Sequence, residues 1–444
     1  VNNLTGPHMF PVDPTLHWAN PNMMPMMPDQ PWPLFPPGFP EAQSPVPVVP
    51  HLHGGEVPSE SDGHPEAWFT ADGKTGPAYT TDFYTYPNEQ QPTTLWYHDH
   101  ALGITRINVM SGLAGFYLLR DPGDNIAPLL PQGKYEVPVV IQDRSFNADG
   151  SFFFDSVGVN PTIHPYWTPE FFGNAIMVNG KTWPNFNVER GQYRFRVLNG
   201  SNARFYNLKL SNKQDFVQIG SDGGYLPAPV NMNSLLLAPG ERADILVDFS
   251  SAAPGTKIIL ENNARAPYPK GTPADPQTVG QIMQFTVQGT APVVPSPLPA
   301  ILNNIPVLTP NAPVRTLTLN EVMGPAGPVA ALLNGQPWHT AATELPRVGA
   351  TEEWQIFNLT GDTHPIHLHL VQFQVVSRQK FQVGKYDTDW MMQNGGMMPP
   401  LMQPTVALPA GPYLQGKPEA PAPNETGWKD TVRMTPGGRN TRRF

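Results

Sequence analysis

The sequence predicts an all-β protein, and three observations support this fold class. Proline and glycine account for 56 and 39 of the 444 residues, which disfavours long regular helices. Segments such as QYRFRVLN and RADILVDF alternate apolar and polar residues, a pattern typical of half-buried antiparallel strands. Apolar residues make up 39% and charged residues 14%, as in chains that bury sizeable cores. We therefore expect β-sandwiches or β-barrels joined by long loops.

A weak internal repeat divides the chain into three predicted domains. Strand-like runs end in Asn and a short polar turn at residues 1–5, 196–201 and 355–360. The second and third runs follow a lead-in that opens with Asn-Gly, a strong hairpin signal, and a tryptophan. The predicted domains are residues 1–124, 135–290 and 310–444. Because the first run has no lead-in, we expect the first domain to lack its opening strands.

Composition also limits the partners. The net charge is −9 and no basic stripe is present, so nucleic acid is not an expected partner. No stretch approaches 18 consecutive apolar residues, so no membrane span is expected. The opening VNNLTGPHMF has neither a basic start nor an apolar core, and gives no indication of compartment. The absence of cysteine excludes disulfides, zinc fingers and thiolate ligands within these 444 residues.

The histidines are the residues that indicate a functional site. Seven of the twelve histidines fall in three short clusters: His51 and His53; His98 and His100; and His364, His367 and His369. Each cluster contains His-x-His, and residues i and i+2 of a strand face the same side, so two imidazoles would lie side by side. Neutral imidazole is a ligand for Cu, Zn, Fe or Ni. The sequence therefore predicts a metal site that the fold assembles from distant segments.

A simpler interpretation is that these are satisfied core or surface histidines, which would suffice for a single His-x-His. Three such clusters, with over half of all histidines, argue against it. An all-histidine set without thiolate points away from structural zinc, and a three-histidine zinc site would use only three of the seven. More than three convergent imidazoles indicate several metal ions.

These motifs resemble those of a known family. HLHGG, LWYHDHALGITRINVMSGLAGFYLLRDP and THPIHLHL look like the first three copper motifs of multicopper oxidases, nearest to the bacterial spore-coat laccase and bilirubin-oxidase-like branch. SDGHPEAWF, QIGSDGGYL, LAPGERADILVDF and GWKDTV extend the resemblance over nearly the whole chain. The resemblance implies three cupredoxin-like Greek-key β-barrel domains, with a trinuclear copper cluster between the first and third. It favours a location outside the cytoplasm or in a spore coat by association alone.

The resemblance also implies a role for each matching residue. The type 2 copper would be held by His51 and His367, and the type 3 pair by His53 with His98 and by His100 with His369. His364 matches a ligand of the mononuclear type 1 copper. Asp62 matches an acidic residue that assists proton delivery to oxygen, although SESDGHP alone is also compatible with an ordinary turn aspartate. Asp99 should face the opposite side of its strand and serve structure.

The sequence departs from the family at the fourth motif, a His-Cys-His that supplies the type 1 thiolate and two type 3 ligands. Here GWKDTVRMTPGGRNTRRF runs to residue 444 without it. Blue copper needs that thiolate, so we expect no normal laccase turnover from these 444 residues. Two explanations compete: a fragment of a longer oxidase, which would leave unpaired strand edges, or a natural short form that binds metal without oxidising anything.

Two methionine-rich segments support an alternative. They contain Met23, Met24, Met26 and Met27, and Met391, Met392, Met397, Met398 and Met402. Thioethers favour Cu(I), which would make the protein a cuprous-ion oxidase, but methionine also fills adaptable surfaces.

Three function classes follow. The first is an oxidase of phenolic or similar small aromatic substrates, or of metal ions, with dioxygen as acceptor. The second is a non-catalytic copper-binding protein. The third, another copper enzyme such as a nitrite reductase, is disfavoured because it also needs a type 1 cysteine. The oligomeric state is not indicated.

Overall fold

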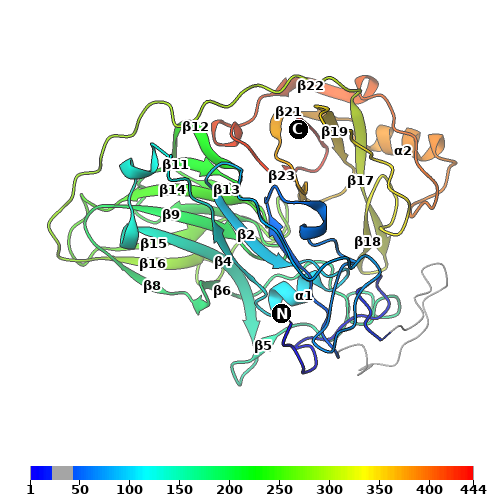
Figure 1. Ribbon diagram of the computed structural model, residues 1–444, viewed down its shortest axis with the longest axis horizontal. Helices are drawn as coiled ribbons and strands as arrows, with labels where there is room; N and C mark the ends of the chain where they lie inside the picture. The colour runs from blue at the N-terminus through cyan, green and yellow to red at the C-terminus, as the bar shows by residue number, and fades with distance from the viewer. Residues whose placement is uncertain (1, 23–43, 444) are drawn as a thin grey trace.

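The structure, a computed structural model, describes residues 2–22 and 44–443 and confirms the all-β prediction. Within these residues the two α-helices are short, α1 (Thr105–Met110) and α2 (Val383–Gln393). Figure 1 shows the strands of residues 136–287 on the left and those of residues 315–443 at the upper right, with the first sheet between them. No helix among the described residues is long and apolar enough to cross a membrane.

The first sheet is small and antiparallel. It consists of β1 (Pro50–His53), β2 (Thr94–Asp99) and β3 (Ala114–Leu118), in the order β1-β2-β3. The register pairs His51 with His98 and His53 with Trp96, so two of the histidine clusters lie on neighbouring strands. Below the sheet, α1 and the first residues of the chain bury a separate core that contains Phe10, Trp18 and Ile107.

The middle region contains two sheets that share one apolar core. The larger has the order β12-β11-β14-β9-β4-β6-β7 with β5 beside β4, and the smaller the order β13-β10-β15-β16-β8. The strands are β4 (Glu136–Phe146), β5 (Phe152–Phe153), β6 (Ala175–Val178), β7 (Lys181–Thr182), β8 (Asn185–Val188), β9 (Gln192–Asn199), β10 (Tyr206–Leu210), β11 (Phe216–Ser221), β12 (Gly224–Met232), β13 (Leu235–Leu237), β14 (Arg242–Asp248), β15 (Lys257–Asn262) and β16 (Gln281–Val287). Side chains from both sheets, such as Val197 and Phe285, fill the space between them.

The third region has a six-stranded sheet of order β18-β17-β19-β24-β21-β22 and a separate pair, β20 with β23. The strands are β17 (Arg315–Gly324), β18 (Gly327–Leu333), β19 (Glu353–Asn358), β20 (His364–His367), β21 (Gln374–Phe381), β22 (Leu414–Glu419), β23 (Thr431–Met434) and β24 (Gly438–Arg443). The β20–β23 register pairs His367 with Thr431, which brings the GWKDTV segment beside the third histidine cluster.

Two details of the strand prediction are wrong. The prediction of half-buried antiparallel strands holds only in part for β9, which pairs antiparallel with β14 but parallel with β4, and which is buried on both faces from Tyr193 onward. Its polar face is covered because Arg194 binds Asp244 within the sheet and Arg196 donates to Thr94 of the first sheet, 2.9 Å away. Parallel pairs also join β8 to β16 and β17 to β19. Such pairs form between strands that are distant in sequence, which local alternation cannot indicate.

Candidate metal centre

Six of the seven predicted imidazoles meet at one place, where the first sheet faces the β20–β23 pair. They come from β1, from β2 and the residue after it, and from the end of β20 and the turn beyond: His51, His53, His98, His100, His367 and His369. The His-x-His partners lie side by side as predicted, with ring centroids 5.8, 5.7 and 4.8 Å apart in the three clusters. His51 and His367 are 316 residues apart in sequence, yet their Nε2 atoms are separated by 3.4 Å.

Backbone carbonyl groups fix which ring nitrogen of three imidazoles carries the proton. The Nδ1 of His51 is 2.5 Å from the carbonyl oxygen of Asp62, and that of His98 is 2.7 Å from the carbonyl oxygen of Asp99. The Nδ1 of His367 is 2.9 Å from the carbonyl oxygen of Asp430. A carbonyl oxygen only accepts, so each Nδ1 must carry a hydrogen and donate it. Each neutral ring therefore keeps a lone pair on Nε2.

His53 has the opposite tautomer. The Thr431 hydroxyl donates to Asp430 Oδ1 at 2.9 Å, and therefore accepts from His53 Nε2, which lies 3.0 Å away. Asp430 Oδ1 is itself 3.3 Å from the same nitrogen. The lone pair of His53 is then on Nδ1, which faces His98 Nε2 at 3.3 Å.

Two pairs of nitrogen lone pairs thus face each other, His51 with His367 and His53 with His98. No proton is left to place between the members of either pair, so the facing lone pairs repel unless a cation lies between them. Separations of 3.3–3.4 Å can be spanned by two metal–imidazole bonds of about 2.0 Å. The donor set therefore fits a metal ion at each pair, and imidazole without thiolate is a suitable set for copper.

Burial keeps four of the six imidazole rings neutral, those of His51, His53, His98 and His100. It lowers the pKa of His51 to about 4, although Asp62 acts in the opposite direction. It also lowers the pKa of His53, His98 and His100 well below the ordinary range, and the neighbouring imidazoles add to the effect. Neutral imidazole is the form that binds metal, so the site is prepared for metal at neutral pH.

The remaining two imidazoles share the Asp62 side of the cluster. His369 Nδ1 donates to Asp62 Oδ2 at 2.9 Å, and the rings of His100 and His369 are 4.9 Å apart, edge to face. His100 Nδ1 is buried and has no hydrogen-bond partner in the described parts of the chain. An orphaned buried imidazole nitrogen is costly unless something binds it, which again fits a metal. Burial alone would raise the pKa of Asp62, but hydrogen bonds from His369 and His51 hold it well below its ordinary range.

His364 does not join the six. It begins β20, and its Nε2 lies 2.6 Å from the Thr360 hydroxyl and 3.5 Å from Glu321 Oε1. Asp99 is also apart from the metal-facing side. Its carboxylate accepts from the amides of Val49 and Ala101 and from Asn108, all within 3.0 Å, which is the structural role expected of it.

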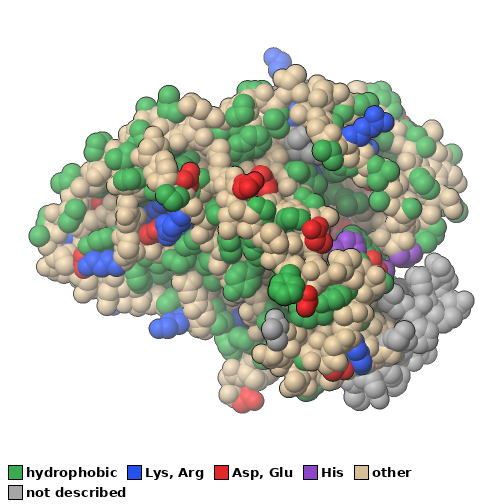
Figure 2. Space-filling view, viewed as in Figure 1, with side chains coloured by type: hydrophobic (Ala, Val, Ile, Leu, Met, Phe, Trp, Pro, Cys, Tyr) green, Lys and Arg blue, Asp and Glu red, His purple; other side chains and the backbone are tan. Residues whose placement is uncertain are grey.

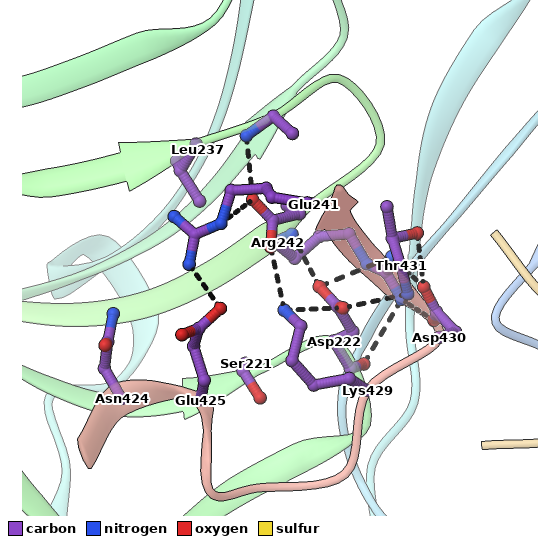
Figure 3. A network of polar contacts seen from close by, with 12 residues as sticks. Ser221, Asp222, Leu237, Glu241, Arg242, Asn424, Glu425, Lys429, Asp430 and Thr431 are labelled. Carbon is purple, nitrogen blue, oxygen red and sulfur yellow. Dashed lines mark hydrogen bonds and ion pairs between the residues drawn. The ribbon is translucent and has the colours of Figure 1, made fainter. Parts of the chain in front are cut away.

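Sequence reasoning did not identify the buried network of charges behind the cluster (Figure 3). Arg242 of β14 pairs through both Nη atoms with the Asp430 carboxylate, and its Nε donates to the carbonyl oxygen of Thr94 in β2 at 3.0 Å. Lys429 binds Asp222 at 2.9 Å and Glu241 at 3.1 Å. The network therefore joins all three regions of the chain behind His53 and His367.

A signal for this network was present in the sequence. SDGG, PGERAD and GWKDTV each carry charged residues next to segments of strand character, and such charges must be paired if the strands are buried. The sequence does not show which charges pair, because the segments are far apart: Asp222 follows β11, and Asp430 precedes β23 more than 200 residues later.

Family models described as multicopper oxidase match residues 43–124, 158–275 and 308–444. A laccase of Bacillus subtilis (strain 168) is 42% identical over 446 aligned residues, which cover 98% of this chain and 78% of that protein. Multicopper oxidase LPR1 of Arabidopsis thaliana is 39% identical, with 98% of this chain and 71% of that protein covered.

Solved structures have the same fold. The McoA multicopper oxidase of Aquifex aeolicus matches with a TM-score of 0.66 at 29% identity, over 89% of this chain and 77% of that one. A multi-copper oxidase of Pediococcus acidilactici matches with a TM-score of 0.67 at 27% identity, over 90% of this chain and 70% of that one. With its cupredoxin fold, its convergent imidazoles and relatives that align along nearly all of it, this chain belongs to the multicopper oxidase family, whose cofactor is copper.

Proposed function

We propose that the six imidazoles hold three copper ions at which dioxygen is reduced to water with electrons from a small organic substrate. His51 and His367 hold one ion, His53 and His98 the second, and His100 and His369 the third. The proposal rests on the two facing nitrogen pairs, His51 with His367 and His53 with His98, because neither nitrogen of a pair has a hydrogen to donate to the other. Copper supplies one-electron redox chemistry, which matches four single-electron oxidations of substrate to one dioxygen.

The chain's own residues orient the ligands and handle protons. The carbonyl oxygens of Asp62, Asp99 and Asp430 fix three rings, and Thr431 fixes the reversed tautomer of His53. Asp62 is the proton-handling residue of the proposal. Its Oδ2 accepts from His369, while its Oδ1 lies 3.3 Å from His51 Nδ1, so the carboxylate stays ionised beside the cluster and can accept or relay protons there.

We propose that the three regions form three domains, at residues 1–124, 135–290 and 310–444. Their apolar cores have the representatives Ile107, Phe285 and Ile356, and Phe154 and Phe171 of the second region pack into the first core. The metal-binding residues come from the first and third domains. The second contributes Arg242 and Asp222 to the network behind them.

The 444 residues contain no cysteine, so His364 has no thiolate with which to form a blue copper site. We therefore propose that this chain binds copper but passes electrons to it slowly. Oxygen uptake with a phenol should stay near the rate of free copper. Robust turnover together with strong blue absorption would contradict this expectation.

The copper sites are tested by loading the protein with copper, removing loose metal, and counting copper per chain with electron paramagnetic resonance in parallel. We expect about three coppers in the wild type, since imidazole suits copper. His51→Ala and His367→Ala should each lose the paramagnetic type 2 signal. His64→Gln, which removes an exposed imidazole outside the six, should lose nothing. Equal copper content in all variants would refute the assignment.

A second candidate is oxidation of a metal ion, and an acidic group beside His364 favours it. Glu321 lies 3.5 Å from His364. Burial and the charges of Asp362 and Glu321 raise the pKa of Glu170 to about 7, and burial and the charge of Asp362 also raise the pKa of Glu321, so the three carboxyl groups repel one another. A cation would relieve their mutual repulsion.

The methionines of the second methionine-rich segment, residues 391–402, are compatible with oxidation of a metal ion. Met392, Met397 and Met398 are 71%, 63% and 80% exposed, whereas Met391 packs against the core under α2. The methionines at positions 23–27 lie outside the described residues. Replacing Met392, Met397 and Met398 by Leu should weaken Cu(I) binding in a competition with a Cu(I) chelator. Unchanged affinity would remove these thioethers from the proposal, and Glu321→Gln tests the acidic group in the same assay.

A further inference from the structure

Three histidines outside the copper cluster gather at a second contact between the first and third regions. His17 and His64 belong to the first region, while His339 follows β18 in the third. Glu66 lies with them, and its carboxylate Oε1 is 3.9 Å from His17 Nε2. Figure 2 shows histidine side chains at the surface of one face of the molecule, beside a hollow.

The geometry of His17 and His339 is similar to that of the proposed copper ligands. Their ring centroids are 5.9 Å apart with an interplanar angle of 66°. The facing pair His51 and His367 has centroids 5.6 Å apart at 61°, and His53 and His98 have centroids 5.5 Å apart. Two imidazoles with centroids this close can reach one ion between them after rotation of the exposed His339 side chain.

The backbone holds His17 and Glu66 together. The Ala19 amide donates to the carbonyl oxygen of Leu102 at 2.8 Å, and the Leu102 amide donates to the carbonyl oxygen of Pro65 at 3.1 Å. The segments that carry His17 and Glu66 are thus both hydrogen-bonded to Leu102, two positions after His100. On the other side, the ring of Trp338 lies 5.8 Å from that of His64 and places His339 against the first region.

The His17 ring lacks the hydrogen bonds that would explain its position. Its Nδ1 is buried without a hydrogen-bond partner among the described residues, and 3.9 Å to Glu66 is too long for a hydrogen bond from Nε2. A half-buried imidazole that is held only by packing, next to a carboxylate and a second imidazole, is therefore available to bind an ion.

We propose that His17, Glu66 and His339 form a mononuclear site for a divalent transition-metal ion, separate from the copper cluster. Two imidazoles and one carboxylate suit ions such as Zn²⁺, Co²⁺, Cu²⁺ or Fe²⁺, with water completing the coordination. Because the ligands come from both regions, a bound ion links the first region to the third next to the His98–His100 segment. The site is independent of the proposed copper roles, since it uses none of the six imidazoles.

The test uses the full chain loaded with copper and then dialysed against a chelator, which strips copper from the partly exposed second site but not from the buried cluster, so that added Co²⁺ reports on the second site. Visible d–d absorption should rise to a plateau at one Co²⁺ per chain. His17→Gln, His339→Gln and Glu66→Gln should each weaken Co²⁺ binding about tenfold or more. Glu89→Gln, which removes another exposed carboxylate, is the matched control and should bind as the wild type does.

His339 is exposed, so its replacement leaves the fold intact and keeps the test decisive. Zn²⁺ should also raise the thermal midpoint of the wild type, and not that of His339→Gln. Equal Co²⁺ affinity in the wild type and His339→Gln, or no Co²⁺ bound by the wild type, would overturn the proposal. Neither outcome bears on the copper count, so the two proposals fail separately.

Discussion

Single side chains in this protein are placed by what their neighbours can accept or donate. Arg242 is the clearest case. It is fully buried, pairs with the Asp430 carboxylate, and donates to the carbonyl oxygens of Thr94 and Gly240. Asp430 in turn lies against His53 and His367. Arg242 therefore fixes the carboxylate of Asp430, which in turn lies against two of the proposed copper ligands.

Arg242→Met should destabilise the protein strongly, because it leaves Asp430 buried without its cation. Breaking one partner of a buried ion pair costs about 3–5 kcal/mol. Arg120→Met is the matched control. Arg120 also pairs with a carboxylate, Glu136 at 2.9 Å, but it is 57% exposed, and such pairs contribute about 0–1 kcal/mol. Urea unfolding of both variants gives the comparison, and similar losses would contradict the role of burial.

Gly54→Ala should disturb the metal centre through sterics. Gly54 has φ +84°, and a Cβ there would collide with the Asp430 carboxylate and come within 2.7 Å of Arg242 Nη2. Gly73→Ala is the control, since Gly73 has φ +86° but nothing within 4 Å of the added carbon. Both variants carry the backbone strain of about 1–2 kcal/mol, and only Gly54→Ala should also lose copper. Equal copper content in the two variants would refute this expectation.

At the scale of elements, a short 3₁₀ helix, η6 (Pro423–Glu425), is joined to two strands by one carboxylate. Glu425 is buried and binds Arg378 of β21 at 2.6 Å and Arg433 of β23 at 2.6 Å. Burial alone would raise the pKa of Glu425, but the two guanidinium groups hold it well below the ordinary range. The contact positions the segment that leads into GWKDTV.

Because the folded pKa of Glu425 lies below its unfolded value of about 4.3, its stabilisation is complete at neutral pH and declines as the pH falls below about 5. Glu425→Gln should therefore be less stable than the wild type at pH 7, and the difference should shrink towards pH 4. Glu419→Gln, an exposed change on β22, should show neither effect. Urea midpoints between pH 4 and 7 measure the difference, and a gap that stays constant would contradict it.

The sequence predicts elements well where they repeat a local pattern. Alternation in RADILVDF and QYRFRVLN indicates strands, and His-x-His indicates paired imidazoles. It does not predict that β9 is parallel to β4 or that its arginines are buried, since both depend on strands distant in sequence. The pairing of Asp430 with Arg242 depends on three-dimensional docking in the same way, whereas the family resemblance already set His364 apart from the six.

For the molecule as a whole, the histidine cluster is a contact between two regions that the middle region supports from behind. Metal that binds the folded chain alone must stabilise it, by about 2.7 kcal/mol at a hundredfold excess over Kd. Copper should therefore raise the thermal midpoint of the wild type, and a chelator should reverse the effect. The rise should be smaller in His367→Ala, which removes one side of the contact. An equal rise in both proteins would mean that copper binds elsewhere.

The separation of 316 positions between His51 and His367 also sets an order of events during synthesis. The ribosome releases His51, His53, His98 and His100 long before His367 exists, so a growing chain offers only the His53–His98 half of the facing pairs. Contacts so distant along the chain close late, because loop closure precedes any gain from them. Metallation is therefore a finishing step, and premature copper would meet an incomplete and weaker set of donors.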